Sequence, residues 1–299
     1  MSFSSDIKTE LCAAPLADKA LAAAEAYGVL LFGRTFSQRE VRIVTASDAF
    51  ADRLPKLFFR AFGVRLPEPD RSGRGHRSFR TDRPEDIAAM FDAYGLDMRR
   101  TVSHHVNLGA LEEPGCSAAF LRGAFLAGGS VTDPVKNYHM ELSTAHYSVS
   151  RECAAMLAEL DLRPGEITRG GNYVLYYKKS ERIEDLLSTI GATTCAMRVM
   201  SAKVEKSMTN SINRKVNCDA ANVDKTVAAA QAQLEAIRRI DREYGLDTLP
   251  EPLQQAALLR FANPEVSLTD LARLSYPPVS RSTLSYRLKK LMEYKGSGE

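Results

Sequence analysis

An internal repeat constrains the fold of this chain more than any other feature of its sequence. Residues 28–36 read glycine, four apolar residues, glycine, any residue, a hydroxyl residue and an apolar residue, and residues 123–131 repeat that order 95 positions later. Two more glycines, Gly75 and Gly95, recur at nearly the same offset as Gly171 and Gly191. A constant spacing over several landmarks indicates duplication, with repeats at about 14–97 and 114–195.

Both repeats show the same predicted order of elements, α-β-α-β-β-α. Apolar residues at helical spacing predict helices over residues 17–32, 48–62, 83–93, 116–126, 148–160 and 181–190. Strand-like patterns cover residues 40–46, 75–81, 138–144 and 172–177. Asp48 is the expected N-cap of the helix that follows it. The first part of the chain, residues 1–205, is therefore expected to form a duplicated α+β domain.

Small residues recur four positions apart in the opening helix of each repeat. They are Ala24 and Gly28 in the first, and Ala119, Gly123 and Ala127 in the second. Because small side chains let two helix backbones approach closely, we expect these helices to pack together at a pseudo-twofold axis.

The rest of the chain is expected to be all-helical. Residues 206–222 are rich in Asn, Ser and Thr, whose side chains compete for backbone hydrogen bonds and favour turns and caps, so they predict a structured connector. From residue 223 to 299 we expect a separate domain, which begins with helices over residues 224–244 and about 250–261.

A helix-turn-helix is predicted at residues 267–294. Ser267 is positioned as the N-cap of a short helix over residues 268–274, and Pro277 and Pro278 end it. Ser280 then caps a second helix that begins at Arg281, with a buried leucine every three or four residues. Residues 267–295 include six basic and two acidic residues, so the polar face of this segment carries excess positive charge and can contact phosphate.

Position in the second helix suggests the role of each polar side chain. In a helix-turn-helix the first turns of the second helix enter the major groove, so Arg281, Ser282, Thr283 and Ser285 are candidates for contacts with base edges. Arg287, Lys289 and Lys290 are better placed for phosphates. Tyr286 belongs to the same DNA-binding surface or serves in packing. The alternative is a helical hairpin with a solvated basic face.

Composition excludes several classes of protein. The formal net charge is +3. The five cysteines are odd in number and never form a C-x-x-C pair, and this pattern argues against a disulfide framework or a zinc site. We expect no metal, cofactor or membrane partner, and the N-terminus lacks a signal-peptide pattern, so a cytoplasmic protein is expected.

For the other candidate sites in the repeats, an ordinary structural role is favoured over a functional one. The glycine-framed segments mimic a phosphate-binding loop, but they lack its preceding strand and its lysine. His139 and Glu141 match half of a zinc deaminase signature, and a polar strand face is favoured. His104 and His105 lack a partner at metal spacing. A basic cluster in a glycine-rich loop could contact phosphate, although a solvated loop is favoured. The cluster consists of Arg71, Arg74, His76, Arg77 and Arg80.

Residues 121–131 resemble the LAGLIDADG signature of homing endonucleases, and residues 26–36 resemble a weaker first copy. In that family the signature helix ends in an acidic residue that holds a divalent metal at the cleaved phosphate. Those positions are Gly33 and Gly128 here, and neither can coordinate a metal. The resemblance therefore implies a related fold that is not an enzyme.

Across nearly its whole length the chain is similar to the WhiA family of bacterial sporulation and cell-division regulators. The similarity is carried by residues 120–130, 210–222, 224–227, 240–241, 245–250 and 277–282. It implies a sequence-specific transcription regulator that binds double-stranded DNA, with a second regulator or RNA polymerase as a further partner and association with the nucleoid. The alternative is a nucleoid-associated or scaffold protein with little promoter-specific regulation.

Overall fold

The computed structural model describes residues 2–72, 75–97 and 103–295, and the chain divides into two compact units, Met1–Ser207 and Met208–Glu299. The first unit mixes helices and antiparallel sheets, and the second is helical, so the expected fold class is confirmed. No helix in the described part of the chain is both long enough and apolar enough to cross a membrane.

The first repeat contains helices α2 (Lys19–Phe32), α3 (Asp48–Phe62) and α4 (Pro84–Asp92), with strands β1 (Thr35–Phe36), β2 (Val41–Thr45), β3 (Asp70–Ser72) and β4 (His76–Thr81). The second contains α5 (Cys116–Gly128), α6 (Tyr147–Glu159) and α7 (Ser180–Ile190), with β5 (Gly129–Val131), β6 (Met140–Thr144), β7 (Gly165–Arg169) and β8 (Asn172–Tyr177). A helix α1 (Phe3–Cys12), which the sequence pattern did not predict, precedes them, and a short 3-10 helix η1 (Leu108–Leu111) lies between them.

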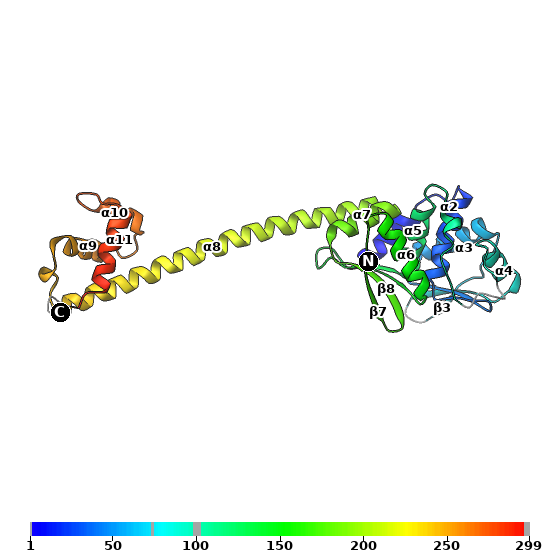
Figure 1. Cartoon of the computed structure of the whole chain (residues 1–299), viewed down its shortest axis with the longest axis horizontal. Coiled ribbons are helices and arrows are strands. Elements are labelled where there is room, and N and C mark those ends of the chain that lie inside the picture. Colours follow the sequence, from blue (N-terminus) through cyan, green and yellow to red (C-terminus); the bar gives the residue numbers. More distant parts are fainter. Residues whose placement is uncertain (1, 73–74, 98–102, 296–299) are drawn as a thin grey trace. The chain divides into compact units, whose positions relative to one another are not determined.

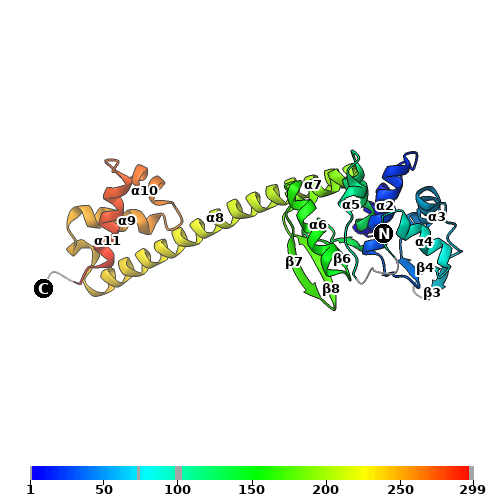
Figure 2. The same ribbon diagram turned by 45° about the vertical axis from the view of Figure 1, so that its right-hand side comes forward.

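Each repeat builds its own antiparallel sheet, and the two sheets have the same topology. Their strand orders are β1-β2-β4-β3 and β5-β6-β8-β7. Cross-strand pairs such as Ile43 with Phe79 and Leu142 with Leu175 are buried in the core. Figures 1 and 2 label β3 of the first sheet and β7 and β8 of the second.

The structure corrects two details of the predicted repeat. Each repeat has two strands after its opening helix, because β1 and β5 are present in addition to β2 and β6. Strands of two and three residues are too short for an alternating pattern to show in the sequence. In addition Ser47, not Asp48, caps α3: its side chain accepts a hydrogen bond from the Phe50 amide, and Asp48 is the first helical residue.

Helices α2 and α5 pack directly against each other through their glycines. A Cβ atom on Gly28 would lie 2.0 Å from the carbonyl oxygen of Phe120, and one on Gly123 would lie 1.9 Å from that of Glu25. No side chain fits in such a space, so the two backbones touch only because these residues are glycines. The expected close approach of the opening helices is therefore confirmed.

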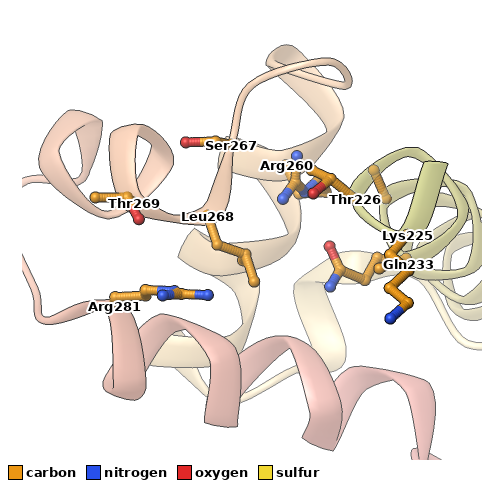
Figure 3. Close-up of a pocket in the computed structure, with 10 residues that line it drawn as sticks. Lys225, Thr226, Gln233, Arg260, Ser267, Leu268, Thr269 and Arg281 are labelled. Atoms are coloured by element: carbon orange, nitrogen blue, oxygen red, sulfur yellow. The ribbon is translucent and has the colours of Figure 1, made fainter. Parts of the chain in front are cut away.

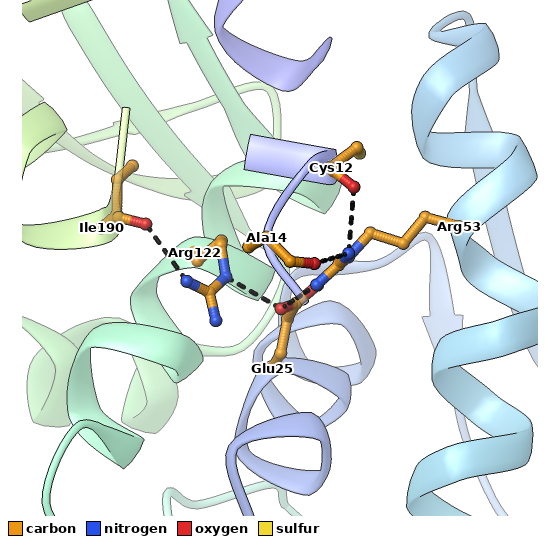
Figure 4. A network of polar contacts seen from close by, with 6 residues as sticks. All are labelled: Cys12, Ala14, Glu25, Arg53, Arg122 and Ile190. Carbon is orange, nitrogen blue, oxygen red and sulfur yellow. Dashed lines mark hydrogen bonds and ion pairs between the residues drawn. The ribbon is translucent and has the colours of Figure 1, made fainter. Parts of the chain in front are cut away.

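A buried carboxylate beside this contact binds two arginines (Figure 4). Glu25 is fully buried on α2; it accepts hydrogen bonds from Arg53 of α3 at 2.6 and 2.9 Å, and from Arg122 of α5 at 2.8 Å. Arg53 also donates to the carbonyl oxygens of Cys12 and Ala14 at 3.0 and 2.6 Å. Glu25 thus joins the two repeats, and Arg53 connects them to the C-terminal end of α1.

The second unit begins within α8 (Thr193–Glu243), the longest helix of the chain. It continues with a 3-10 helix η2 (Leu246–Thr248), α9 (Glu251–Ala262), α10 (Leu268–Leu274) and α11 (Arg281–Met292). Its core includes Ile237 and Ile240 of α8, Leu271 of α10, and Leu284 of α11. The turns expected in residues 206–222 are replaced by continuous helix: no Gly or Pro interrupts α8, and exposed polar side chains are tolerated on a helix surface.

We predict that Glu25→Gln lowers the free energy of unfolding by about 3–5 kcal/mol, because it leaves two partly or fully buried guanidinium groups without their carboxylate. The matched control is Asp52→Asn, which removes an exposed partner of Arg77 and is expected to cost less than about 1 kcal/mol. Urea denaturation of the full chain measures both. Equal effects of the two substitutions would contradict a structural role for the buried network.

Candidate nucleic-acid interface

Serine side chains fix the starting points of the last two helices. The Ser267 hydroxyl accepts a hydrogen bond from the Asp270 amide at 3.3 Å and donates to the Asp270 carboxylate at 2.7 Å, which begins α10. The Ser280 hydroxyl accepts from the Thr283 amide at 3.1 Å, which begins α11 at Arg281. Each serine satisfies an amide that has no partner in the helix, so both helices start where the sequence pattern predicts.

The turn between these helices comprises residues 275–280. The Val279 amide donates to the Ala272 carbonyl oxygen at 3.2 Å, and the Ser275 hydroxyl bonds to the carbonyl oxygens of Ala272 and Pro277 at 3.1 and 2.9 Å. The chain therefore folds back onto the end of α10, which sets the direction in which α11 leaves the turn.

Three leucines determine which face of α11 points outward. Leu284, Leu288 and Leu291 are each 1 % exposed and lie in the core of the unit. In α10, Leu271 and Ala272 are buried, whereas Leu274 is 56 % exposed and does not share their face. It is the last residue of the helix, where the chain already turns away. The leucine stripe leaves the opposite face of α11 to solvent.

The structure places the predicted DNA-binding side chains of α11 on this outer surface. Seven are exposed and Arg287 is half-buried; the seven are Arg281, Ser282, Thr283, Ser285, Tyr286, Lys289 and Lys290. Tyr286 is 62 % exposed, and the Lys290 ammonium lies 5.7 Å from its ring centroid. Tyr286 thus lies on the outer surface rather than in the packing of the helical core.

The side chains on this face differ in how free they are to bind a ligand. The hydroxyls of Ser282 and Thr283 each lie 2.8 Å from the Ser280 hydroxyl, so they take part in the helix cap. Lys289 lies 3.7 Å from the Glu293 carboxylate. Among the described residues, no carboxylate lies within ion-pair distance of Arg281, Arg287 or Lys290. These three charges are available to an external anion.

Gly33 and Gly128, which the sequence predicted to be degenerate nuclease positions, lie at the ends of α2 and α5. Gly33 follows α2, and a Cβ atom there would lie 2.8 Å from the Val29 carbonyl oxygen. Gly128 is the last residue of α5, and its Cβ would lie 2.3 Å from the Ser143 carbonyl oxygen. Both positions exclude a side chain unless the backbone shifts. The described residues contain no group of three or more His, Cys, Asp or Glu side chains arranged for a metal ion.

Polar side chains that the sequence marked as weaker candidates in the repeats bond to other residues of the chain. Arg77 contacts Asp48 and Asp52 at 2.6 and 3.1 Å, and Arg80 contacts Glu40 at 3.1 Å. Arg74 and the side chain of Arg71 lie outside the described residues.

The histidines of the repeats are also engaged within the chain. His139 lies 2.7 Å from Glu141, which also binds Arg169 at 2.6 Å. His105 lies 2.7 Å from Glu152, and His104 bonds the Phe36 carbonyl oxygen at 2.5 Å.

Sequence reasoning missed two basic residues beside the start of α11. Lys225 of α8 and Arg260 of α9 line the same pocket as Arg281. Arg260 is 1 % exposed, although its place in an apparently ordinary amphipathic helix gave no sign of burial. Lysine and arginine in such helices are mostly solvated, so no sequence signal distinguishes these two.

Comparisons with known proteins agree with this architecture. The sequence matches the family model of the WhiA LAGLIDADG-like domain over residues 117–209 and that of the WhiA C-terminal HTH domain over residues 212–295. A probable cell division protein WhiA from Ruminiclostridium cellulolyticum is 36 % identical over 304 residues, which covers 98 % of this chain and 96 % of the relative.

Two solved structures share the fold. The crystal structure of full-length WhiA from Thermotoga maritima has a TM-score of 0.60 at 24 % identity and covers 98 % of this chain and 97 % of that one. The crystal structure of an N-terminal LAGLIDADG domain of WhiA has a TM-score of 0.50 at 22 % identity and covers 64 % of this chain and 90 % of that one. The duplicated α+β unit, the helix-turn-helix and a relative matched over nearly its full length together show that the chain belongs to the WhiA family.

Proposed function

We propose that this protein is a sequence-specific DNA-binding regulator of transcription, acting on cell-division or sporulation genes, and that its DNA-binding domain is the helical unit of about residues 223–299. The observation that carries the proposal is the exposed face of α11, where Arg281 and Lys290 have no carboxylate partner among the residues that the structure describes. Relatives that bear the name probable cell division protein support the choice of target genes.

The positions of the side chains along α11 support two proposed roles. Arg281 and Ser285 lie one turn apart in the first half of the helix, the part of a recognition helix that meets base edges. Lys289 and Lys290 lie in its last turn, where contacts with the phosphate backbone set affinity and orientation. Arg287 is half-buried on the flank near Tyr276, so a phosphate at the edge of the groove is its expected contact.

The LAGLIDADG-like unit is proposed to have no nuclease activity and to serve contacts with protein or DNA. The proposal rests on Gly33 and Gly128, where the space for a metal-binding side chain is taken by backbone carbonyl groups. Cleavage by this fold needs oxygen ligands for a divalent cation at those two helix ends.

Further partners and location follow as parts of the same proposal. Exposed apolar side chains beside the helix-turn-helix turn, Leu258, Leu274 and Tyr276, line a common pocket that a second regulator or RNA polymerase could contact. Binding to chromosomal DNA would place the protein at the nucleoid in the cytoplasm.

The double substitution Lys289→Ala/Lys290→Ala is expected to weaken binding to all DNA sequences alike. Because each lost phosphate contact removes about one released counterion, the slope of log affinity against log salt should fall by about 2. Fluorescence anisotropy of the full chain at several salt concentrations measures this. Lys178→Ala/Lys179→Ala, two exposed residues of the other unit, is the matched control. An unchanged slope would remove the phosphate assignment.

Arg281→Ala is expected to lose sequence discrimination and to keep general DNA binding. A bidentate arginine contact with guanine contributes about 1–3 kcal/mol of discrimination. The measurement is a genome-wide map of bound DNA in cells, with Arg273→Ala as control because Arg273 of α10 is exposed and paired with Asp270. Specific sites that persist in Arg281→Ala would contradict base reading by Arg281, and a parent protein that shows no specific sites would favour a nucleoid-associated or scaffold protein.

Purified full-length protein with magnesium is expected to leave supercoiled plasmid intact, because neither signature helix ends in a metal ligand. Agarose gels resolve nicked, linear and supercoiled DNA over hours of incubation. Metal-dependent nicking that follows the protein through independent preparations would overturn the assignment.

A further inference from the structure

A pocket of about 260 Å³ lies within the helical unit, beside the start of the recognition helix (Figure 3). Helices α8, α9, α10 and α11 all contribute to its wall. Its lining includes Lys225 and Gln233 of α8, Arg260 of α9, Thr269 of α10 and Arg281 of α11. Figure 3 shows Arg281 extending from α11 toward the α8 side, where Gln233 and Lys225 project.

The wall of this pocket is cationic. Three helices each supply one positive charge, Lys225 from α8, Arg260 from α9 and Arg281 from α11, and none of the ten lining residues is acidic. In the described part of the chain none of the three forms an ion pair, in contrast to Arg77, which contacts two carboxylates. Like charges placed together without a counterion repel, so an anion in the pocket would relieve that repulsion.

Arg260 carries the strongest indication of a missing partner. It is 1 % exposed, and its Nη1 atom donates to the carbonyl oxygens of Val266 at 2.8 Å and Asn263 at 3.3 Å, while its Nε atom is buried without a partner. Burial lowers the pKa of Arg260. Only carbonyl dipoles compensate this buried charge, and burying a charge without a counter-charge is costly.

A buried amide also lacks a partner in this pocket. Gln233 is 7 % exposed, and its Oε1 atom has no hydrogen-bond donor. The oxygen and nitrogen of an amide exchange places by a half-turn, so Gln233 can either accept a hydrogen bond from a ligand hydroxyl or donate one to a ligand oxygen. The Thr269 hydroxyl offers a further donor on the α10 side.

The volume limits the ligand. At about 260 Å³ the pocket is smaller than the roughly 300–1,000 Å³ of typical sites for drug-sized molecules. It accommodates a tetrahedral oxyanion with a short substituent. Arginine and lysine together favour phosphoryl oxygens, which a guanidinium binds with two parallel hydrogen bonds.

We propose that this pocket binds a phosphoryl group, held between Lys225, Arg260 and Arg281. The group has two possible sources, the backbone of bound DNA or a free phosphorylated metabolite, and the chemistry of recognition is the same for both. Because Arg281 also begins the recognition helix, occupancy of the pocket would set where its guanidinium points. The proposal does not rest on DNA binding, since inorganic phosphate alone tests it.

The experiment is isothermal titration of the full chain with inorganic phosphate at constant ionic strength, using chloride as the balancing anion. We expect saturable binding at one site. Lys225→Gln should weaken it by about tenfold, the effect of losing one charge-assisted hydrogen bond. Lys225 is exposed, so this variant should fold, and Lys215→Gln, an exposed lysine on the same helix outside the pocket, is the matched control that should bind as the parent does.

DNA distinguishes the two sources. If the pocket receives a phosphate of the DNA backbone, inorganic phosphate and DNA compete, and Lys225→Gln weakens both. If it receives a free anion, Lys225→Gln weakens only phosphate binding and leaves DNA affinity in phosphate-free buffer unchanged. Absence of saturable phosphate binding, or equal binding by Lys225→Gln and Lys215→Gln, would overturn the proposal. If the parent protein binds phosphate but does not bind DNA, the result would contradict the proposed function and leave the pocket proposal standing.

Discussion

The contact between α2 and α5 is the constraint on which the duplicated unit depends. Gly28 and Gly123 let the two backbones meet at a distance that no side chain could occupy. The helices then place the buried carboxylate of Glu25 between Arg53 and Arg122, one from each repeat, and each repeat adds its own four-stranded sheet. Helix packing this close leaves no alternative register, because a shift of one residue would bring a Cβ atom into a carbonyl oxygen.

The same close packing bears on the chemistry of the unit. Gly33 and Gly128, the proposed degenerate nuclease positions, lie at the ends of these two helices. Backbone carbonyl groups of Val29 and Ser143 fill the space that such side chains would need. Restoring an acid at Gly128 would therefore require movement of the strand that contains Ser143, not only a change of residue.

In the helical unit, burial of leucines and capping by serines together position the basic residues. Leu284 and Leu288 turn the opposite face of α11 outward, and Ser280 fixes the residue at which the helix begins. Arg281 consequently lies at the start of α11, on the surface proposed to bind DNA, and also at the wall of the cationic pocket. The proposed contacts with bases and with a phosphoryl group thus share one side chain.

The sequence by itself determined the duplication, the three helices and two of the strands in each repeat, and both capped helices of the helix-turn-helix, because apolar periodicity and capping residues are local signals. It also placed the candidate residues of α11 on one helix. Only the tertiary structure decided the short strands β1 and β5 and the continuity of α8. Strands of two or three residues are too short to show a period, and exposed Asn, Ser and Thr do not by themselves break a helix. The sequence also could not predict that Lys225, Arg260 and Arg281 line one pocket, because they lie on three separate helices that only the tertiary fold brings together.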